Sequence, residues 1–274
     1  NPVASNGSLM TAPGVAKRLK ALTSRGKLVV VDPRRTETAE IASEHLFIQP
    51  GGDALFLVAF VQALTRIGPP RTERYGETIA GLDEALAAVA GIDCSELEAR
   101  SGVDSATVAR LAGEFHAAPS AVAYGRMGVS VQADGTLCQW LLQLINLYTG
   151  NLDREGGGLV NEPAIAITGP GTSPGQRGRW HSRVRGLAEF AGELPVSVLA
   201  EEIQTPGQGQ VRGLMTIAGN PVLSTPDGRG LDLALEHREL FDGSVSVAPQ
   251  LRDWASASPL VSRRQYRHDD VVHD

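Results

Sequence analysis

Three short apolar runs, each ending at once in a loop of Gly, Asn, Asp or Pro, constrain the fold of this chain more than any other feature. In chain order they read VVVDPRRT, AVAYGRMG and MTIAGNP. Such a run is typical of a buried strand, and such a loop is typical of the carboxyl edge of an open α/β sheet. The opening residues NPVASNG resemble the third loop and are a candidate fourth. The pattern predicts an α/β fold.

Helical periodicity between these runs completes the α/β pattern, with Gly, Pro and Asp marking helix ends. We predict helices over 13–26, 54–65, 82–90, 95–101, 105–117, 135–147, 196–203 and 231–239, and strands over 28–31, 121–124, 214–218 and 244–247. The strand at 28–31 is expected to be fully buried. The helix at 135–147 is apolar almost all round, so this helix and its Cys138 are expected in the core.

Composition divides the chain into parts. Residues 151–181 are dominated by glycine, proline and threonine, and a loop of that length is usually functional or mobile. We therefore expect an α/β domain over 1–150, a glycine- and proline-rich crossover loop over 151–181, and part of a second α/β domain over 182–274. The helix that precedes strand 28–31 is half of a βαβ repeat, so the first domain is expected to lack its N-terminal strand.

Charge and cysteine content exclude several classes of protein. The 274 residues carry a formal net charge of −6, so a general nucleic-acid surface is not expected. Two cysteines are too few for a disulfide framework, and no stretch has the ~20 apolar residues of a membrane span. A cytoplasmic location is the default expectation. A periplasmic location stays open, because the sequence begins at Asn1 and hides any targeting signal.

The loops after the apolar runs carry residue types that bind nucleotides. A carboxylate such as Asp32 or Asp53 can accept from ribose hydroxyls or from a guanine edge, and Arg34 can pair with phosphate. Each loop also has a structural reading. Asp-Pro, GRMG and GNP are common turns, and Asp53 is a candidate N-cap for the helix that follows it. Several such loops at successive strand ends favour a dinucleotide site as much as they favour a set of turns.

Other catalytic motifs are absent from the sequence. It contains no GxGxxG, no P-loop, no HExxH and no GxSxG, and no residues stand out as a metal site or as a general acid and base. His268 and His273 flank DDVV, where a solvated tail is the preferred interpretation over a metal site. We therefore assign no catalytic residue and expect a cofactor to supply the chemistry.

Several segments, in order, resemble the molybdopterin oxidoreductases of the dimethyl sulfoxide reductase, formate dehydrogenase and nitrate reductase superfamily. They are NPVASNGSLM, GKLVVVDPRRTETAEIASEHLFIQPGGDALFL, YGRMGVSVQADGTLCQWLLQLINLYTGNLDREGGG, SRVRGLAEFAGELPVSVLAEEIQTPGQGQVRGLMTIAGNPVLSTPDG and RHDDVV. The resemblance implies an internal fragment of the catalytic subunit. It also implies a Rossmann-like three-layer dinucleotide-binding domain with part of a related partner domain.

The resemblance implies a cofactor and a set of residues that bind it. The cofactor is bis(molybdopterin guanine dinucleotide) with Mo or W, and an iron–sulfur cluster is expected outside this chain. Asp32 and Arg34 resemble the pair at the guanosine end of one nucleotide, and Asp53 resembles the acid that reads its guanine. Gly125, Met127 and Gly128 resemble the loop under the pterin, and Asn220 with Pro221 resembles the partner-domain loop at the second nucleotide.

The sequence departs from the family pattern in two places. Glu162, Pro163 and Ala164 stand where formate dehydrogenases carry an arginine near the metal, so formate oxidation by that arrangement is not expected. Ala248 and Pro249 follow VSV where an Asp or Ser-Asp is usual, which weakens the second nucleotide site. The family's metal ligand would precede Asn1.

The expected function is therefore two-electron redox or oxo-transfer chemistry by the full-length protein, with this chain supplying cofactor-binding surface and inactive by itself. A small-molecule substrate and an electron-transfer subunit or ferredoxin-like partner are implied. A non-catalytic scaffold or degenerate paralogue that acts in subunit assembly is the alternative from another class. An NAD-dependent dehydrogenase is a third reading, which the absence of GxGxxG disfavours.

Overall fold

The structure, a computed structural model, describes residues 1–4, 14–160, 177–216 and 220–236. The chain divides into two compact units, Asn1–Asn161 (unit 1) and Glu162–Asp274 (unit 2), and each has its own core. Several sequence predictions lie outside the described residues. They are the strand at 244–247, the interpretation of His268 and His273, and the departures at Glu162, Pro163, Ala164, Ala248 and Pro249.

Unit 1 contains a small parallel sheet of β1 (Val29–Val31) and β2 (Glu44–Leu46), in which Val31 pairs with Leu46. The crossover between them contains α2 (Glu37–Glu40), which Thr36 caps by accepting from the backbone N–H of Ala39. The predicted strand is present but half-buried rather than fully buried. Only one strand is paired with it in the described part of the chain, and its side chains rest on the core from one side.

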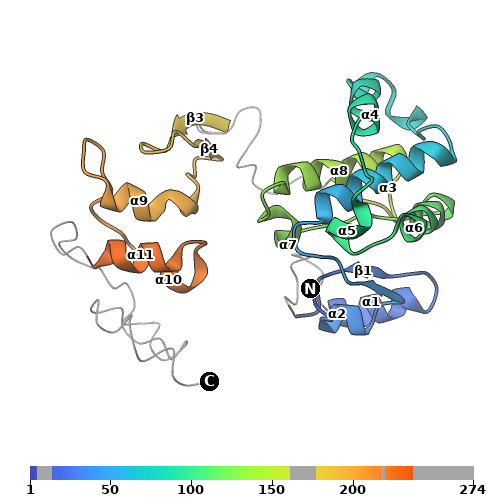
Figure 1. Cartoon of the computed structure of the whole chain (residues 1–274), viewed down its shortest axis with the longest axis horizontal. Helices are drawn as coiled ribbons and strands as arrows, with labels where there is room; N and C mark the ends of the chain where they lie inside the picture. The colour runs from blue at the N-terminus through green and yellow to red at the C-terminus, as the bar shows by residue number, and fades with distance from the viewer. Residues whose placement is uncertain (5–13, 161–176, 217–219, 237–274) are drawn as a thin grey trace. The chain divides into compact units, whose positions relative to one another are not determined.

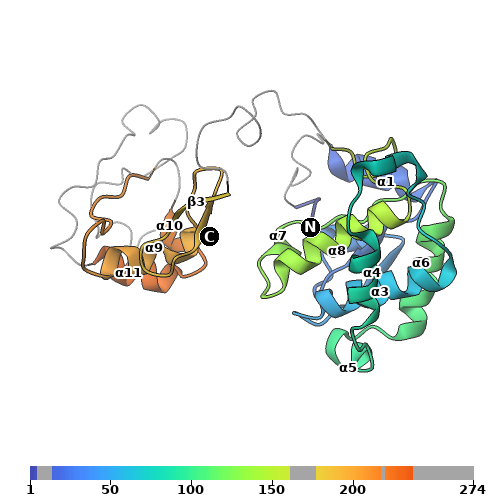
Figure 2. The same cartoon turned by 90° about the horizontal axis from the view of Figure 1, so that it is seen from above.

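Helices make up the rest of unit 1 (Figures 1 and 2). They are α1 (Val15–Thr23), α3 (Asp53–Ile67), the 3₁₀ turn η1 (Glu73–Thr78), α4 (Leu82–Ala90), α5 (Leu97–Ser101), α6 (Ser105–Ala117), α7 (Met127–Ser130) and α8 (Gly135–Tyr148). Helix α3 packs against both α6 and α8, and its buried residues run from Phe56 to Leu64 almost without a break. The predicted core position of Cys138 on α8 is confirmed.

The segment predicted as a strand at 121–124 is not a strand. Its Ala123 instead binds a side chain: Asn146 on α8 accepts from the Ala123 N–H and donates to the Ala123 carbonyl, both at 2.8 Å. The N–H of Ala121 donates to the side chain of Asn151 at 3.2 Å. Buried backbone groups need partners, and here side-chain amides provide them in place of a neighbouring strand.

A cluster of four charged side chains joins the sheet to α6. Lys27, which precedes β1, pairs with Glu44 at 2.6 Å and with Glu114 at 2.5 Å. Arg110 pairs with the same two carboxylates, at 2.5 Å and 2.8 Å. Because each carboxylate meets two cations, the pKa of Glu44 is lowered, first by the Arg110 hydrogen bond and then by that of Lys27.

The described part of unit 2 begins with an antiparallel hairpin, β3 (Arg177–His181) and β4 (Ala188–Phe190). Next come the 3₁₀ turn η2 (Val196–Val198), α9 (Leu199–Gln204), α10 (Pro221–Ser224) and α11 (Gly228–Leu235). The helix predicted at 231–239 begins earlier because Asp227 caps it by accepting from the Gly230 N–H. Residues 214–216, predicted as part of a strand, are not in one, and no strand is paired with them among the described residues.

The described part of unit 2 has a small core. It consists of Ala200 and Ile203 from α9 with Leu231 and Ala234 from α11. An ion pair between Arg183 and the buried Glu202, 3.3 Å apart, ties the hairpin to α9.

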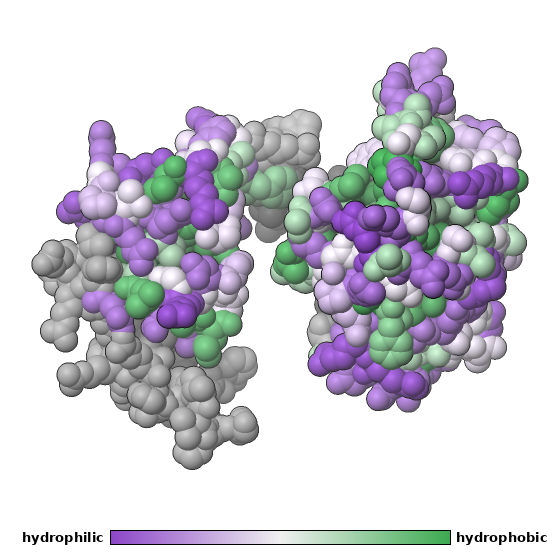
Figure 3. All heavy atoms as spheres, in the orientation of Figure 1, coloured by the Kyte–Doolittle hydropathy of each residue, from purple (hydrophilic) through white to green (hydrophobic). Residues whose placement is uncertain are grey.

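The surfaces of both units are mixed, with apolar side chains scattered among hydrophilic ones (Figure 3). Among the described residues, no helix combines the length and the apolar character that crossing a membrane requires.

Candidate functional site

The loop between β1 and α2 holds Asp32 and Arg34 in a tight turn. The Asp32 backbone N–H donates to the Leu46 carbonyl, and its Oδ1 accepts from the Arg34 backbone N–H at 2.8 Å. The turn predicted from Asp-Pro is therefore present, and it orients the Asp32 carboxylate. Oδ2 of Asp32 has no hydrogen-bond partner among the described residues, so it is available to a ligand.

His45 on β2 forms a hydrogen bond with the backbone of the same loop. Its Nε2 lies 3.0 Å from the Asp32 carbonyl, and because a carbonyl only accepts, Nε2 donates. Its ring lies against Phe47, with centroids 4.2 Å apart. Phe47 is 58% exposed at the end of β2. His45 thus fixes the backbone position of Asp32.

The chain's first residues dock on α2, beside this loop. Asn1 donates to the Glu37 carboxylate at 2.6 Å and accepts from the Thr38 hydroxyl at 2.8 Å. The Val3 N–H donates to the same hydroxyl at 3.0 Å. The pKa of Glu37 is lowered, first by a backbone hydrogen bond, then by the Asn1 amide and further by Arg34. The described residues 1–4 of the candidate fourth loop therefore lie next to the first loop.

Asp53 is the first residue of α3 and not its cap, which corrects the capping interpretation. Gly52 is the N-cap, and no side-chain hydrogen bond caps the helix. The Asp53 carboxylate points instead toward the turn between α7 and α8, where its Oδ2 accepts from Gln132 at 2.7 Å. The same Gln132 nitrogen donates to the Gly128 carbonyl at 3.0 Å. One amide thus joins two predicted site residues, Asp53 and Gly128.

Gln139 on α8 fixes the other end of the Gly125–Ser130 loop. It donates to the Gly125 carbonyl at 3.1 Å and to the Ser130 hydroxyl at 2.9 Å. A Cβ on Gly125 would lie 2.6 Å from terminal side-chain atoms of both Leu142 and Val129, so those two side chains would have to move to admit a larger residue. Two glutamines therefore hold the loop by its carbonyls.

Gly128 and Met127 form the outer side of this loop. A Cβ on Gly128 would meet no atom within 4 Å, and Met127 is 66% exposed. The two residues thus offer a flat backbone patch and a flexible apolar side chain to a ligand.

The predicted site residues Asp32 and Asp53 of unit 1 lie in the segments that follow the carboxyl ends of β1 and β2. In a parallel pair the carboxyl ends of both strands lie at the same edge, and here Asp32 follows β1 while the loop to Asp53 follows β2. Gln132 then links Asp53 to the loop of Met127 and Gly128.

Asn220 and Pro221 lie in unit 2, at the start of α10. The Asn220 side chain caps this helix by accepting from the Leu223 N–H at 3.3 Å, and Pro221 occupies the first helical turn. The turn predicted from GNP is therefore a helix start. The amide nitrogen of Asn220 has no partner among the described residues.

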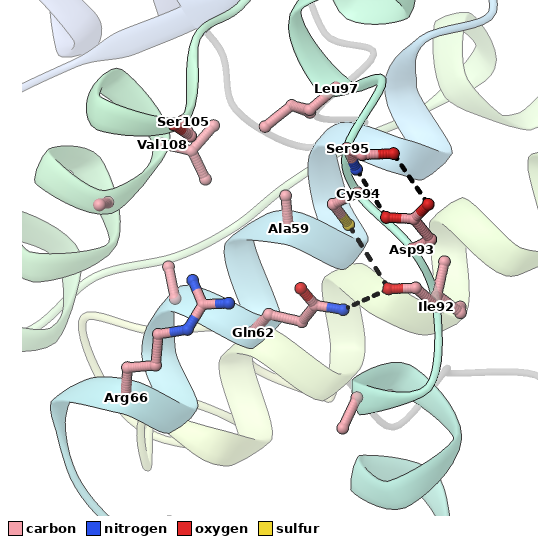
Figure 4. A pocket seen from close by; sticks show the side chains of 13 residues that line it. Ala59, Gln62, Arg66, Ile92, Asp93, Cys94, Ser95, Leu97, Ser105 and Val108 are labelled. Carbon is pink, nitrogen blue, oxygen red and sulfur yellow. Dashed lines mark hydrogen bonds between the residues drawn. The ribbon is translucent and has the colours of Figure 1, made fainter.

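A cavity of about 370 Å³ lies elsewhere in unit 1, between α3, the segment before α5 and the start of α6 (Figure 4). None of the predicted site residues lines it. Its polar groups are largely satisfied from within, since Gln62 donates to the carbonyls of Val89 and Ile92 while Asp93 accepts from Ser95. Cys94 is a weak nucleophile there, because burial and then Asp93 raise its pKa. We therefore place the candidate site at the open loops and not in this cavity.

Gln132, Gln139 and His45 were not singled out from the sequence. The two glutamines stand seven residues apart around the start of α8, and that spacing is the signal that could have placed them on one face. Among the described residues, no group of three His, Cys, Asp or Glu side chains could hold a metal ion.

Comparisons with known proteins agree with the resemblance read from the sequence. The chain is 29% identical over 229 residues to an assimilatory nitrate reductase of Haloferax mediterranei, covering 78% of this chain and 31% of that protein. It is 28% identical over 236 residues to a nitrate reductase of Klebsiella oxytoca, covering 81% and 27%. A third relative, 28% identical over 181 residues, is the molybdopterin-containing subunit of an arsenate respiratory reductase from Chrysiogenes arsenatis, with 57% and 21% covered.

The fold has a counterpart among solved structures. Acetylene hydratase from Pelobacter acetylenicus superposes with a TM-score of 0.64 at 19% identity, over 83% of this chain and 36% of that one. No protein-family model matches the chain. The chain spans about a third or less of the length of the curated relatives named above. Sequence motifs and relatives agree: over about 80% of its length the chain is similar to part of the catalytic subunits of the molybdopterin oxidoreductase superfamily.

Proposed function

We propose that the full-length protein is a molybdenum or tungsten oxidoreductase that uses bis(molybdopterin guanine dinucleotide) for two-electron or oxo-transfer chemistry. In this proposal unit 1 holds one guanine dinucleotide and unit 2 contributes to the second, each within a Rossmann-like domain. The relatives named as nitrate and arsenate reductases support the reaction class.

One observation carries the proposal: Gln132 joins Asp53 to the loop of Met127 and Gly128. A guanine presents two neighbouring N–H donors on one edge, and a carboxylate is the side chain that accepts from such an edge. Oδ1 of Asp53 and Oδ2 of Asp32 have no partners among the described residues. The donor and acceptor chemistry of these residues therefore fits a guanosine.

Each residue has a role that follows from its position. Asp53 would accept from the base and Asp32 from the ribose hydroxyls or the base. Arg34 is exposed and makes no ion pair with a described residue, so it can meet phosphate. The open backbone at Gly128 lets a flat ring system approach closely. When bound, the cofactor supplies the redox chemistry through its metal ion, and these residues orient it.

Asn220 and Pro221 are proposed to serve the second nucleotide. The cap that Asn220 makes uses its oxygen, which leaves its amide N–H groups to donate to a ligand.

An electron-transfer partner and an iron–sulfur cluster held outside this chain complete the proposal. Two further relatives are named as alpha subunits, of an NADPH-Fe(3+) oxidoreductase and of an F420-dependent formate dehydrogenase. Those names support a multi-subunit assembly.

The test uses the full-length protein, purified from a host that makes the cofactor. Mo and W are measured by mass spectrometry, and GMP is measured after acid hydrolysis. About two GMP per metal ion are expected. Asp32→Ala should weaken cofactor retention about tenfold, since it removes a charged acceptor. Asp83→Ala, at an exposed acid in the first turn of α4, is the matched control.

Neither metal nor GMP in the wild-type protein would overturn the proposal and favour a non-catalytic scaffold. Unchanged GMP content in Asp32→Ala would overturn the assignment of Asp32 alone.

A further inference from the structure

Gln132 connects the start of α3 to the loop that contains Gly128, a contact that was not predicted from the sequence. It lies in the turn between α7 and α8, and its amide nitrogen bridges the Asp53 carboxylate, at 2.7 Å, and the Gly128 carbonyl, at 3.0 Å. Asp53 and Gln132 are 79 residues apart in the sequence. Both hydrogens of the amide are used, one toward each acceptor.

The orientation of this amide follows from its partners. Asp53 Oδ2 and the Gly128 carbonyl both accept, so only the nitrogen side of Gln132 can face them. A hydrogen bond to a charged acceptor is stronger than one between neutral groups. The Asp53 carboxylate, which does not cap α3, is therefore held by Gln132 in one rotation.

That rotation decides which oxygen a ligand can reach. Gln132 occupies Oδ2, and Oδ1 has no partner among the described residues. The same amide fixes the carbonyl of Gly128, whose outer side is open. The carboxylate and the backbone patch are thus held at a fixed distance from each other.

We propose that Gln132 is a positioning residue for the dinucleotide, which sets the Asp53 carboxylate relative to the Met127–Gly128 loop so that one ligand can contact both. This inference rests on the proposed function and adds to it a residue that touches the carboxylate and not the base. Gln132 holds Oδ2 of the Asp53 carboxylate, and Oδ1 is then the oxygen that a ligand can contact.

The test compares Gln132→Met with Gln143→Met in the full-length protein. Methionine keeps the side-chain length and removes the donors. Gln143 lies on α8 as well, but it is exposed and has no partner among the described residues. Each variant is prepared from a host that makes the cofactor and from one that cannot. The readouts are GMP per protein and the rise in Tm that the cofactor causes.

A positioning role predicts that Gln132→Met binds the cofactor about tenfold more weakly. Its GMP content falls, and the cofactor-induced rise in Tm shrinks, because the stabilisation by a bound ligand increases with the logarithm of its affinity. Gln143→Met should match the wild type in both readouts. If Gln132→Met does not fold, Gln132→Glu keeps the shape and turns an acceptor toward Asp53, and the same losses are expected.

Two results would overturn the inference, and they differ from each other. If Gln132→Met lowers Tm equally with and without cofactor and keeps its GMP, Gln132 is only structural and the proposed function stands. If the wild-type protein contains no GMP, the proposed function fails and this inference fails with it.

Discussion

At the scale of single residues, close backbone approach is the strongest constraint in unit 1. A Cβ on Gly52 would lie 2.6 Å from the Ser101 Cα and 2.8 Å from the Arg100 carbonyl oxygen. The backbone at Gly52 suits any residue, with φ −83° and ψ −6°, so only this contact excludes a side chain. Gly113, inside α6, is the opposite case, because a Cβ there would meet no atom within 4 Å.

These two glycines give a paired prediction. Gly52→Ala should lower the free energy of unfolding by about 1–3 kcal/mol, the usual cost of overpacking. Gly113→Ala should raise it by about 1 kcal/mol, because alanine favours a helix interior. Urea titration of both variants measures the two changes. Equal changes in both variants would contradict the packing described around Gly52.

The sequence singled out Asp53 but gave it the wrong local role. Asp, in a PGGD turn before an apolar helix, has the composition of an N-cap. The partner that turns its carboxylate aside, Gln132, is 79 residues away, and a contact over that distance is decided by tertiary packing. The turn at Asp32 was readable from the sequence, but the support from His45 was not.

At the scale of elements, a side chain of α8 forms the hydrogen bonds that a neighbouring strand would otherwise form with residues 121–124. Asn146, 2% exposed, binds Ala123 through both its oxygen and its nitrogen. The apolar run at 121–124 was predicted as a strand because its composition suits one. The sequence could not show that a helix side chain would take the place of a neighbouring strand.

Replacing Asn146 should therefore destabilise unit 1. Asn146→Leu keeps the branched shape of the side chain but leaves the N–H and carbonyl of Ala123 without partners, which should cost about 2–3 kcal/mol in unfolding free energy. Gln143→Leu, on the same helix but exposed, should stay within about 0.5 kcal/mol of the wild type. Urea unfolding compares the two. A neutral Asn146→Leu would show that Ala123 finds other partners.

The charge cluster between the sheet and α6 predicts a dependence on pH. The folded-state pKa of Glu44 is lowered, first by Arg110 and then by Lys27, relative to an unfolded value near 4.3. Its contribution to stability is therefore present above that unfolded value and is lost as pH falls through the folded pKa.

Glu44→Gln should remove this contribution. The variant should be less stable than the wild type at pH 7, by up to about 1 kcal/mol because the cluster is partly solvated. The difference should shrink below pH 4, where the wild type loses the charge as well. Unfolding free energies at several pH values test this, with the exposed Glu98→Gln as control. A difference that stays constant with pH would contradict the ion pairing.

At the scale of the whole molecule, the chain has two compact units with separate cores. The division falls near residue 161, inside the stretch that composition marked as a crossover loop. Most helices were predicted near their observed bounds, because apolar spacing and capping residues determine them locally. The strands were predicted less well, because a strand exists only if another strand pairs with it.

Both cysteines lie in unit 1, so chemical labelling of their thiols follows the unfolding of that unit only. Cys138 is 0% exposed, and burial raises its pKa to about 11, so only about one in a thousand Cys138 thiols is ionised at pH 8. Iodoacetamide should label the half-buried Cys94 first and Cys138 only on unfolding. Mass spectrometry along a urea series follows both labels. Equal labelling rates in the native protein would contradict the buried position of Cys138.

The small core of unit 2 has a calorimetric consequence. The described part of this unit buries four apolar residues in its core, against more than a dozen in unit 1. Heat capacity change on unfolding scales with the apolar surface exposed, so the described residues of unit 2 should contribute only a small heat capacity change when they unfold. A ligand that binds the folded chain at Asn220 and its neighbours would raise the melting temperature of this part of the molecule as the ligand concentration increases.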